Sequence, residues 1–373
     1  MKWVFWVAAA VIADAYVGYP LWMWFRSWWS PRPVLRGAVE PTVSAAMVVR
    51  NEEGVIAAKL ENLFALNYPA EKLEIVVVSD GSDDGTVAYL QDLQSHPRVR
   101  VLLKSTSQGK AAGLNDAIKL ASGEIVFFTD ARQKIEPGAL RCLLENFADT
   151  EVGCASGELM LGQPGDGETG KGMGLYWRIE KKIRELESAS GSVAGATGAI
   201  YCARRALVDP LPAGTILDDV LLPMQIVAKG SRVVFDSRAR AWDVPDLGQK
   251  REFARKVRTL SGNYQLLQLA PWLLSGKNPI RSEFIRHKML RLAVPFALLA
   301  VFIASLFLPQ PFYRGALLAQ TLFYGLSLAA IAGLNIGPLS RVADAARTFV
   351  LLNSAAMVAF VNFVAGRKAI WVR

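Results

Sequence analysis

Histidine and cysteine are both scarce in this sequence, which has two histidines and three cysteines among 373 residues. The cysteines, Cys142, Cys154 and Cys202, follow no spacing that is typical of a metal-binding motif. With only two histidines, which lie far apart, a zinc site is not expected. We interpret the cysteines as core residues and not as a disulfide, because the domain that contains them is predicted below to face the reducing cytoplasm.

Motifs of two large protein classes are missing as well. No Gly-x-Gly-x-x-Gly sequence follows the first predicted strand, which argues against a dinucleotide-binding dehydrogenase. No segment resembles a nucleic-acid-binding motif, although the formal net charge is +9. Basic residues that flank the apolar runs account for this charge, because such residues usually meet anionic lipid head groups. We therefore expect membrane lipids, and no nucleic acid, among the partners.

Apolar residues are plentiful, at 52% of the chain, and they concentrate in four runs near its two ends. A run of about 20 apolar residues spans the hydrocarbon of a bilayer. The runs cover residues 3–25, 292–308, 312–334 and 348–365. They predict an N-terminal transmembrane helix over residues 1–28, a cytoplasmic domain over 40–270, an interfacial segment over 271–289 and a C-terminal membrane region with two or three spans over 290–373.

Residues around these runs predict their orientation. The first run is interpreted as a transmembrane anchor and not as a cleaved signal peptide, because it is long, lacks a small-residue cleavage site and ends in interfacial tryptophans. Basic residues flank both ends of the middle region, so the positive-inside rule places it in the cytoplasm of a multi-pass inner-membrane protein. Three full C-terminal spans would break this rule at Arg367, Lys368 and Arg373, so residues 345–365 are a candidate for an interfacial or re-entrant segment.

Between the apolar ends, short apolar runs alternate with helical patterns. This alternation predicts an α/β fold with a mostly parallel sheet and helices on both faces. Strands are predicted at 43–49, 73–78, 99–103 and 124–128, with helices at 55–66, 87–93 and 110–120 between them. Beyond residue 130 the pattern weakens, and we predict strands at 153–161, 199–203 and 232–236, helices at 175–188, 216–230 and 250–267, and a glycine-rich loop at 162–174.

Acidic residues stand at the ends of three predicted strands, namely Glu52, Asp80 and Asp130. Ligands of open parallel sheets bind beyond the carboxyl ends of the strands. Carboxylates gathered at one edge repel each other unless a cation lies among them, and a hard divalent cation suits such oxygen ligands. For Asp83 and Asp84, which follow Asp80 closely, a helix N-cap is the alternative interpretation.

These landmarks resemble the inverting family 2 glycosyltransferases, in the membrane-embedded branch that includes cellulose, hyaluronan and poly-N-acetylglucosamine synthases. The resemblance covers most of residues 40–270. It implies a GT-A (Rossmann-like) fold with a mixed, mostly parallel sheet and flanking helices, joined to N- and C-terminal transmembrane helices. It also implies transfer of a sugar from a nucleotide diphosphate sugar, with a UDP-sugar favoured, to a glycan or lipid-linked acceptor in exopolysaccharide or cell-surface glycan synthesis.

The resemblance implies a nucleotide-binding role for four residues. Glu52 in VVRNEE and Asp80 in VSDGSDDGT match acidic residues that contact the base and ribose, and Lys110 in SQGKAAGLNDAI matches a lysine that approaches the nucleotide. Asp130 matches the first aspartate of the DxD motif, which binds the diphosphate and a metal, Mg²⁺ or Mn²⁺. Arg132 replaces the second aspartate. Either fewer protein ligands hold the cation, with Arg132 neutralising phosphate, or the cation is dispensable.

The segment Leu217-Asp218-Asp219 resembles the TED-like catalytic motif, with Asp219 at the position of the base. The acceptor hydroxyl must lose its proton as it attacks the sugar, and a carboxylate within reach can take that proton. Asp218 beside it would raise the pKa of Asp219 through like-charge repulsion. One base and in-line attack imply inversion at the anomeric carbon.

The QxxRW motif of processive members survives only in part. Arg255 and Arg258 stand in its place and would bind the diphosphate, unless they form a basic face of a juxtamembrane helix. Gly195 and Gly198 are interpreted as a close-packed turn on the acceptor side or as plain structural glycines. Transfer of a single sugar to a polyprenyl phosphate is an alternative function, and an inactive scaffold or export partner of a polysaccharide system is another.

Overall fold

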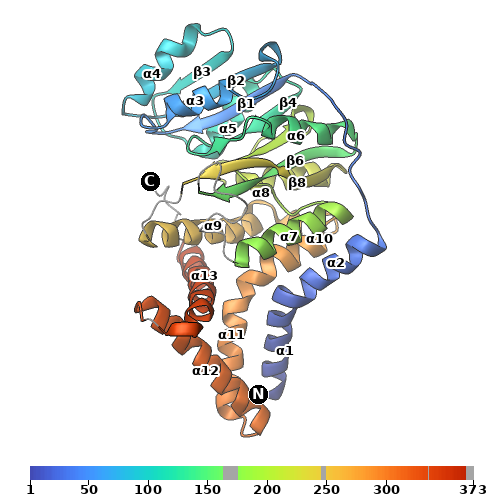
Figure 1. The fold of residues 1–373 in the computed structure, drawn as a ribbon, viewed down its shortest axis with the longest axis vertical. Helices are drawn as coiled ribbons and strands as arrows, with labels where there is room; N and C mark the ends of the chain where they lie inside the picture. Colours follow the sequence, from blue (N-terminus) through green and yellow to red (C-terminus); the bar gives the residue numbers. More distant parts are fainter. Residues whose placement is uncertain (163–174, 245–248, 335, 367–373) are drawn as a thin grey trace. The chain divides into compact units, whose positions relative to one another are not determined.

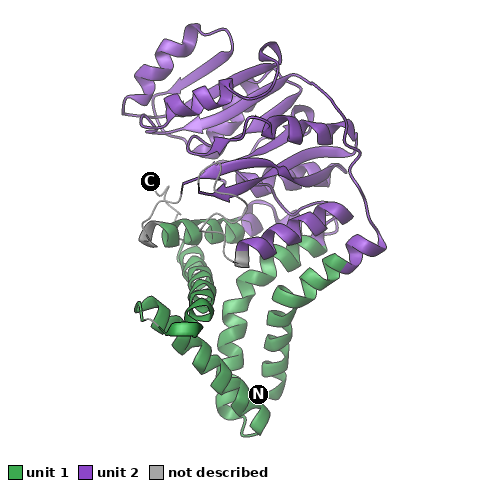
Figure 2. Ribbon diagram, in the orientation of Figure 1, with its two compact units in different colours: residues 1–24, 246–265, 282–373 green, residues 25–245, 266–281 purple. Residues whose placement is uncertain are grey.

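The computed structural model describes residues 1–162, 175–244, 249–334 and 336–366. The chain divides into two compact units, which Figure 2 shows in two colours. Unit 1 contains residues 1–24, 246–265 and 282–373, and unit 2 contains residues 25–245 and 266–281. Apart from Gly162, the predicted glycine-rich loop lies outside the described residues.

Unit 2 is built on an eight-stranded sheet with the order β3-β2-β1-β4-β7-β6-β8-β5 (Figure 1). The first four strands in this order pair in parallel, and so do β6 and β8. The pairs β4–β7, β6–β7 and β5–β8 are antiparallel. The strands are β1 (Val43–Val49), β2 (Leu73–Asp80), β3 (Val99–Lys104), β4 (Ile125–Phe128), β5 (Lys134–Ile135), β6 (Val152–Leu161), β7 (Tyr201–Arg204) and β8 (Arg232–Asp243).

Helices cover both faces of this sheet. The helices α3 and α6 share one hydrophobic core with alternate residues of β1, β2 and β4, as expected for strands buried on both sides. The helix α5 packs on the other face, where a Cβ atom on Gly113 would lie 2.6 Å from Cγ1 of Val48. The helices of unit 2 are α3 (Ile56–Phe64), α4 (Thr86–Asp92), α5 (Lys110–Leu120), α6 (Ala139–Glu145), α7 (Leu175–Ser190) and α8 (Asp218–Ala228).

The predicted alternation of strands and helices is observed up to β4. The structure differs from the prediction beyond this strand, where antiparallel pairs enter the sheet. The sequence analysis missed α6 and the short strand β5. It also ended β8 at Asp236, whereas the strand extends to Asp243. Register shifts between β6 and β8 interrupt the regular pattern of buried residues, which explains why the end of β8 was not recognised.

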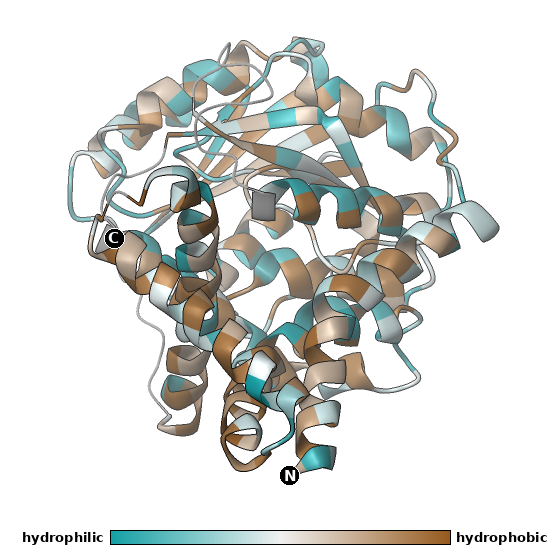
Figure 3. Ribbon diagram, turned by 60° about the horizontal axis from the view of Figure 1, so that its bottom comes forward, coloured by the Kyte–Doolittle hydropathy of each residue, from teal (hydrophilic) through white to brown (hydrophobic). Residues whose placement is uncertain are grey.

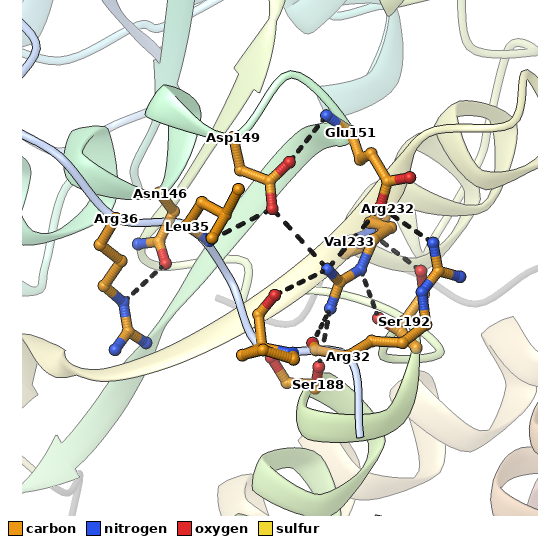
Figure 4. Close-up of polar contacts among 12 residues, drawn as sticks. Arg32, Leu35, Arg36, Asn146, Asp149, Glu151, Ser188, Ser192, Arg232 and Val233 are labelled. Carbon is orange, nitrogen blue, oxygen red and sulfur yellow. Dashed lines mark hydrogen bonds and ion pairs between the residues drawn. The ribbon is translucent and has the colours of Figure 1, made fainter. Parts of the chain in front are cut away.

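A buried arginine anchors the segment that leads from the first apolar helix into the sheet (Figure 4). Arg232 on β8 is 4% exposed, and its guanidinium donates to the carbonyl oxygens of Gly191, Arg32 and Ser188 at 3.1, 2.7 and 3.1 Å. It also lies 3.8 Å from a carboxylate oxygen of Asp149. We call this cluster, consisting of Arg232 and these four partners, the linker anchor.

Unit 1 contains most of the long apolar helices, which Figure 3 colours largely as hydrophobic. Four helical stretches in the described part of the chain are long and apolar enough to cross a membrane, namely Lys2–Trp29, Arg281–Phe307, Pro311–Ile331 and Gly337–Val364. The apolar helices predicted at both ends are thus present as candidate spans. Whether residues 345–365 cross the bilayer or lie at its surface stays a prediction. The stretches comprise α1 (Lys2–Ala13), α2 (Tyr19–Trp29), α10 (Arg281–Phe284), α11 (Leu290–Phe307), α12 (Pro311–Ile331) and α13 (Ser340–Val364). The helix α9 (Gln249–Leu269) precedes α10 in the chain.

The acidic residue inside the first apolar run is neutralised within unit 1. Asp14 lies in a π-helical turn, Asp14–Gly18, between α1 and α2. The Nε atom of Arg286 donates to its Oδ2 atom at 2.9 Å, and a second guanidinium nitrogen donates to Oδ1. Because a lone charge in an apolar helix is unfavourable, this pair explains how Asp14 is accommodated.

Candidate functional site

The carboxyl ends of three neighbouring strands meet at one edge of the sheet in unit 2. The strands β1, β2 and β4 pair in parallel, so Glu52, Asp80 and Asp130 lie at the same edge, as predicted. The strand β7 runs antiparallel to β4, with Tyr201 opposite Phe128. Residues that precede β7 therefore come to the same edge as residues that follow β4.

Lys110 joins the two predicted acidic motifs. Its Nζ atom lies 3.0 Å from Oδ1 of Asp130 and 3.2 Å from Oδ2 of Asp218. Burial acts to lower the pKa of Lys110, but Asp130, Asp218 and Asp219 raise it well above its ordinary value. The lysine is therefore charged, and its ammonium group offsets the negative charges of Asp130 and Asp218.

Asp80 uses its carboxylate to hold the turn that precedes Lys110. It is 1% exposed, and it accepts hydrogen bonds from the backbone N–H groups of Gln108 and Gly109 and from the hydroxyl of Ser107, at 2.7 to 2.8 Å. Burial acts to raise the pKa of Asp80, but these hydrogen bonds outweigh it and the pKa is lowered. Gly109 has a φ of +92°, which favours glycine at this point. Direct contact of Asp80 with a nucleotide stays a prediction.

Glu52 follows β1 and faces the residue that replaces the second aspartate of the DxD motif. Its Oε2 atom lies 3.4 Å from Nε of Arg132, whose side chain is 55% exposed. The contact connects the residue predicted to bind the base with the stretch predicted to bind the diphosphate. An exposed pair of this kind is weak, so Arg132 is able to exchange Glu52 for another anion.

Asp83 and Asp84 serve the start of the next helix. Asp84 accepts a hydrogen bond of 3.0 Å from the N–H of Thr86, the first residue of α4. Asp83 accepts a hydrogen bond of 2.6 Å from the side-chain amide of Asn51. The N-cap of α4 is Gly85, so neither aspartate occupies the predicted N-cap position. Asp84 contacts the first turn from one position earlier, and Asp83 has a local structural role.

The glycine turn before β7 packs directly against Asp219, the predicted base, which is half-buried near the start of α8. The N–H of Ala196 donates to the carbonyl of Asp219 at 2.7 Å. A Cβ atom on Gly198 would lie 3.1 Å from Oδ2 of Asp219, and Gly195 has a φ of +141°. The backbone conformation therefore favours glycine at Gly195, and a side chain at Gly198 would be in tight contact with the Asp219 carboxylate.

Tyr201 is a residue of this edge that the sequence analysis missed. Its ring stacks on Phe128 with 4.5 Å between centroids, and its hydroxyl is buried without a hydrogen-bond partner among the residues that the structure describes. Burial, followed by the charges of Asp218 and Asp219, raises the pKa of Tyr201 well above its ordinary value. A neutral phenol therefore lies close to the acidic pair. In the sequence it is indistinguishable from any aromatic residue of a buried strand.

Arg50 was also missed. It directly follows β1, and its Nε atom is buried without a hydrogen-bond partner in the described part of the chain. Leaving such a donor unpaired is unfavourable, so this atom is suited to an anionic ligand or an ordered water. The sequence shows only an arginine after a strand, because the absence of a partner is visible only in three dimensions.

Arg255 and Arg258 lie on α9, in the part of that helix that belongs to unit 1. One guanidinium nitrogen of Arg255 lies 3.1 Å from Oε2 of Glu252, one turn earlier on the helix. Their predicted contact with a diphosphate stays a prediction, and so does the alternative of a basic helix face.

In the part of the chain that the structure describes, protein groups alone do not form a metal site. Within the described residues, no group of three or more His, Cys, Asp and Glu side chains is arranged to hold a metal ion. Asp130 offers one carboxylate, with a side chain that is 39% exposed. Because magnesium is often held by one or two carboxylates together with substrate phosphates, this donor set fits a cation that binds together with a diphosphate.

A groove at the opposite, amino-terminal edge of the sheet contains none of the predicted site residues. It has a volume of about 510 Å³ and is lined by residues that include Glu74, Arg98 and Ser122. Glu74 accepts a hydrogen bond from the N–H of Ser122 at 2.6 Å and lies 2.9 Å from Nε of Arg100. Its charge is therefore satisfied within the protein.

Known structures and sequences agree with this description of the fold. The mannosyltransferase PcManGT from Pyrobaculum calidifontis, solved in complex with GDP-Man and Mn²⁺, is 25% identical to this chain and superimposes with a TM-score of 0.74. The match covers 98% of this chain and 100% of that one. The expected mixed, mostly parallel sheet with flanking helices is confirmed.

Two curated relatives match part of the chain. A β-monoglucosyldiacylglycerol synthase from Synechocystis is 27% identical over 192 residues, which are 50% of this chain and 40% of the relative. A poly-β-1,6-N-acetyl-D-glucosamine synthase from Staphylococcus aureus is 24% identical over 222 residues, or 58% of this chain and 53% of the relative. The chain thus spans about half, or less, of the length of these relatives. The model of the family described as glycosyl transferase family 2 matches residues 44–209, and the chain therefore carries a glycosyl transferase family 2 domain.

Proposed function

We propose that this chain is an inverting glycosyltransferase that moves a sugar from a nucleotide diphosphate sugar to a glycan or lipid-linked acceptor. The observation that carries the proposal is the position of Lys110, whose Nζ atom lies within 3.2 Å of both Asp130 and Asp218. This contact joins the residue expected at the diphosphate to the motif expected to hold the base. A family 2 domain over residues 44–209 supports the same reaction class.

The donor side follows from the charge of the leaving group. The bond between the anomeric carbon and the diphosphate breaks, and the diphosphate leaves with additional negative charge that positive groups stabilise. Lys110 is charged and lies at Asp130, so its ammonium group is placed to bind the departing phosphate. A divalent cation, Mg²⁺ or Mn²⁺, bound to Asp130 and the diphosphate would neutralise the remaining charge.

The acceptor side centres on Asp219. Its carboxylate takes the proton of the acceptor hydroxyl while the hydroxyl oxygen forms the new bond to the anomeric carbon. Gly198 lacks a side chain at this point, which leaves room for the acceptor next to Oδ2 of Asp219. Asp218 bears a second negative charge beside the base, but its contact with Lys110 offsets this charge.

The donor has two candidate nucleotides, UDP and GDP. The family resemblance favours a UDP-sugar, whereas the structural relative that matches nearly the whole chain was solved with GDP-Man. A donor screen in nanodiscs that measures release of nucleoside diphosphate decides between them and should include UDP-glucose, UDP-N-acetylglucosamine and GDP-mannose. We expect one of these donors to be consumed by the wild type and not by Asp219→Asn. Equal release by both proteins would refute the assignment of the base.

The acceptor also has two candidates, a growing glycan and a lipid. One curated relative is named as a polysaccharide synthase and another as a glycolipid synthase. Thin-layer separation of products from a radiolabelled donor distinguishes the two, because single transfer gives one lipid-bound sugar and polymerisation gives a ladder. Absence of turnover with every donor and acceptor would favour the inactive scaffold instead.

We also propose that the protein is a multi-pass protein of the inner membrane with unit 2 in the cytoplasm. Four candidate spans and the basic residues beside them support this topology. Reporter fusions at the loops after residues 308 and 333 and at the C-terminus test the side of each loop. A periplasmic signal from a reporter placed in the linker near residue 38 would overturn the orientation.

A further inference from the structure

Lys59 is a buried lysine that the reaction proposed above leaves without a role. It lies on α3 and is 3% exposed. Its Nζ atom donates to the hydroxyl of Thr129 at 2.8 Å and to the carbonyl oxygen of Gln133 at 2.7 Å. These two partners bracket the stretch from Asp130 to Arg132. We call residues 129–133 the Asp130 segment.

The Asp130 segment depends on side chains for its conformation, because it forms neither helix nor strand. The Thr129 hydroxyl, which accepts a hydrogen bond from Lys59, donates in turn to the carbonyl of Asp130 at 3.5 Å. Lys59 therefore reaches Asp130 through a single intervening hydroxyl. Lys110 contacts the carboxylate of the same aspartate at 3.0 Å, from a helix on the opposite face of the sheet.

A lysine is an unfavourable choice for a purely structural contact at this point. Both hydrogen-bond acceptors of Lys59 are uncharged groups, and burial of an ammonium group beside uncharged partners lowers stability. Burial lowers the pKa of Lys59 to about 7, while the charge of Asp130 acts in the opposite direction. An apolar side chain of similar length would fill the same space without this penalty. Packing alone therefore does not explain why residue 59 is a lysine.

We propose that Lys59 is a positioning residue that fixes the Asp130 segment so that the Asp130 carboxylate faces the donor diphosphate and its cation. The inference rests on the proposed function, because it assigns Lys59 a part in donor binding. Lys59 touches neither donor nor cation in this scheme. It acts through the hydroxyl of Thr129 and the carbonyl of Gln133.

A second side chain on the same helix provides a matched control. Asn62 exchanges two hydrogen bonds of 2.8 Å with the backbone of Ile135, which lies just beyond the Asp130 segment. Loss of this contact should loosen the short strand β5 and lower stability. It should leave Asp130 in place, because Lys59 still holds both ends of the segment.

The test compares Lys59→Met with Asn62→Ala in the full chain in nanodiscs. We measure kcat, the donor KM and the Mn²⁺ concentration for half-maximal activity, together with amide hydrogen exchange of peptides that cover residues 129–133. For Lys59→Met we expect the donor KM and the half-activating Mn²⁺ concentration to rise by about tenfold or more, as is usual when a group that supports a ligand is removed. We expect a smaller change in kcat and faster exchange confined to the Asp130 segment.

A merely structural role predicts a different pattern. Lys59→Met would then lower the melting temperature and the active fraction, while KM and the Mn²⁺ requirement would stay within twofold of the wild type, and that result would overturn the proposal. Should Lys59→Met fail to fold, Thr129→Val removes the same hydrogen bond from the other end with little change in volume. Failure of the wild type to consume any donor would overturn the proposed function, while hydrogen exchange would still decide whether Lys59 fixes the segment.

Discussion

The linker anchor and the Asp130 segment are each held by a buried basic side chain, yet the two side chains have different partners. Arg232 is surrounded by main-chain carbonyls and a carboxylate, so its donors are used within the protein. Lys59 has two uncharged acceptors and holds a segment whose own charged residues face outward. Both side chains are buried, so burial does not distinguish their roles. The difference lies in their partners, because Arg232 has a charged partner and maintains the fold, whereas Lys59 has only uncharged partners and is proposed to serve the site.

The same contrast separates the two edges of the sheet. At the amino edge, Glu74 is satisfied by Ser122 and Arg100. At the carboxyl edge, Arg50 and Tyr201 each keep a buried polar atom without a hydrogen-bond partner among the described residues. Because native proteins rarely leave such atoms unpaired, these two atoms support the proposal that the ligand binds at the carboxyl edge.

The largest expected effect comes from a change that touches chemistry and not stability. Asp219→Asn keeps the shape of the side chain but cannot take a proton, so we expect kcat to fall by about 10²- to 10⁴-fold. The melting temperature in detergent should stay close to that of the wild type. A variant that retains normal turnover would show that another group is the base.

The next largest effect belongs to the linker anchor and concerns stability. Arg232→Met removes the donor from three carbonyl oxygens and the positive charge from beside Asp149. Loss of one partner from a buried charged cluster lowers the free energy of unfolding by about 3 to 5 kcal/mol. Thermal unfolding measures this loss. The folded fraction should keep the donor KM of the wild type, and a selective rise in KM would place Arg232 on the side of the site instead.

A pH series sharpens the comparison between the two cations. Burial lowers the pKa of Lys59 to about 7, whereas a lysine in the unfolded chain has a pKa of about 10.4. Between these values the unfolded chain binds more protons, so the stability of the wild type should rise with pH by up to about 1.4 kcal/mol per pH unit from this residue. Below about pH 7 and above about pH 10.4 this contribution no longer changes with pH.

Melting temperatures at pH 7.5, 8.5 and 9.5 check this expectation. The wild type should gain stability relative to Lys59→Met across the series, because the variant lacks the titrating group. Arg232→Met should show no such divergence, because arginine stays protonated throughout this range. Parallel curves for wild type and Lys59→Met would mean that Lys59 titrates normally in the folded protein.

The smallest effect is expected from an ion pair in which both partners reach solvent. Lys182 and Glu185 lie one turn apart on α7, 3.2 Å from each other, with side chains that are 64% and 34% exposed. Such pairs contribute about 0.2 to 1 kcal/mol at most, so Lys182→Ala should shift the melting temperature only slightly. A large shift would show that exposed pairs also support this fold, and would weaken the distinction drawn above.

The sequence predicts the first half of the domain well for physical reasons. The strand β1 is a continuous apolar run buried on both faces, and its observed bounds equal the predicted ones. The acidic ends of β1, β2 and β4 meet at one edge because parallel pairing follows from the alternation. The contacts of Lys110 with Asp130 and Asp218 were not predicted, since residues 110 and 218 are far apart in the sequence and the family resemblance implied only that Lys110 approaches the nucleotide.

What the sequence could not predict depends on contacts between distant segments. Lys59 lies in a helix where lysine usually faces solvent, and only the packing of α3 against the Asp130 segment buries it. The reversal of direction at β7 leaves no mark in the apolar pattern, because antiparallel and parallel buried strands have similar compositions. The hydroxyl of Tyr201, which is buried without a hydrogen-bond partner among the described residues, likewise depends on contacts that only the structure shows.

The antiparallel pairing of β4 with β7 also bears on how such proteins diversify. The part of the chain that ends with the Asp130 segment contains Glu52, Lys110 and Asp130. The part that begins with the glycine turn before β7 contains Gly198 and Asp219. Under the proposed roles, one contiguous block of the gene encodes the choice of donor and the next encodes the choice of acceptor. Recombination near the start of α6 would therefore exchange the two blocks in a single event, and the recombined halves would have to preserve the core that they share and the contact of Lys110 with Asp218.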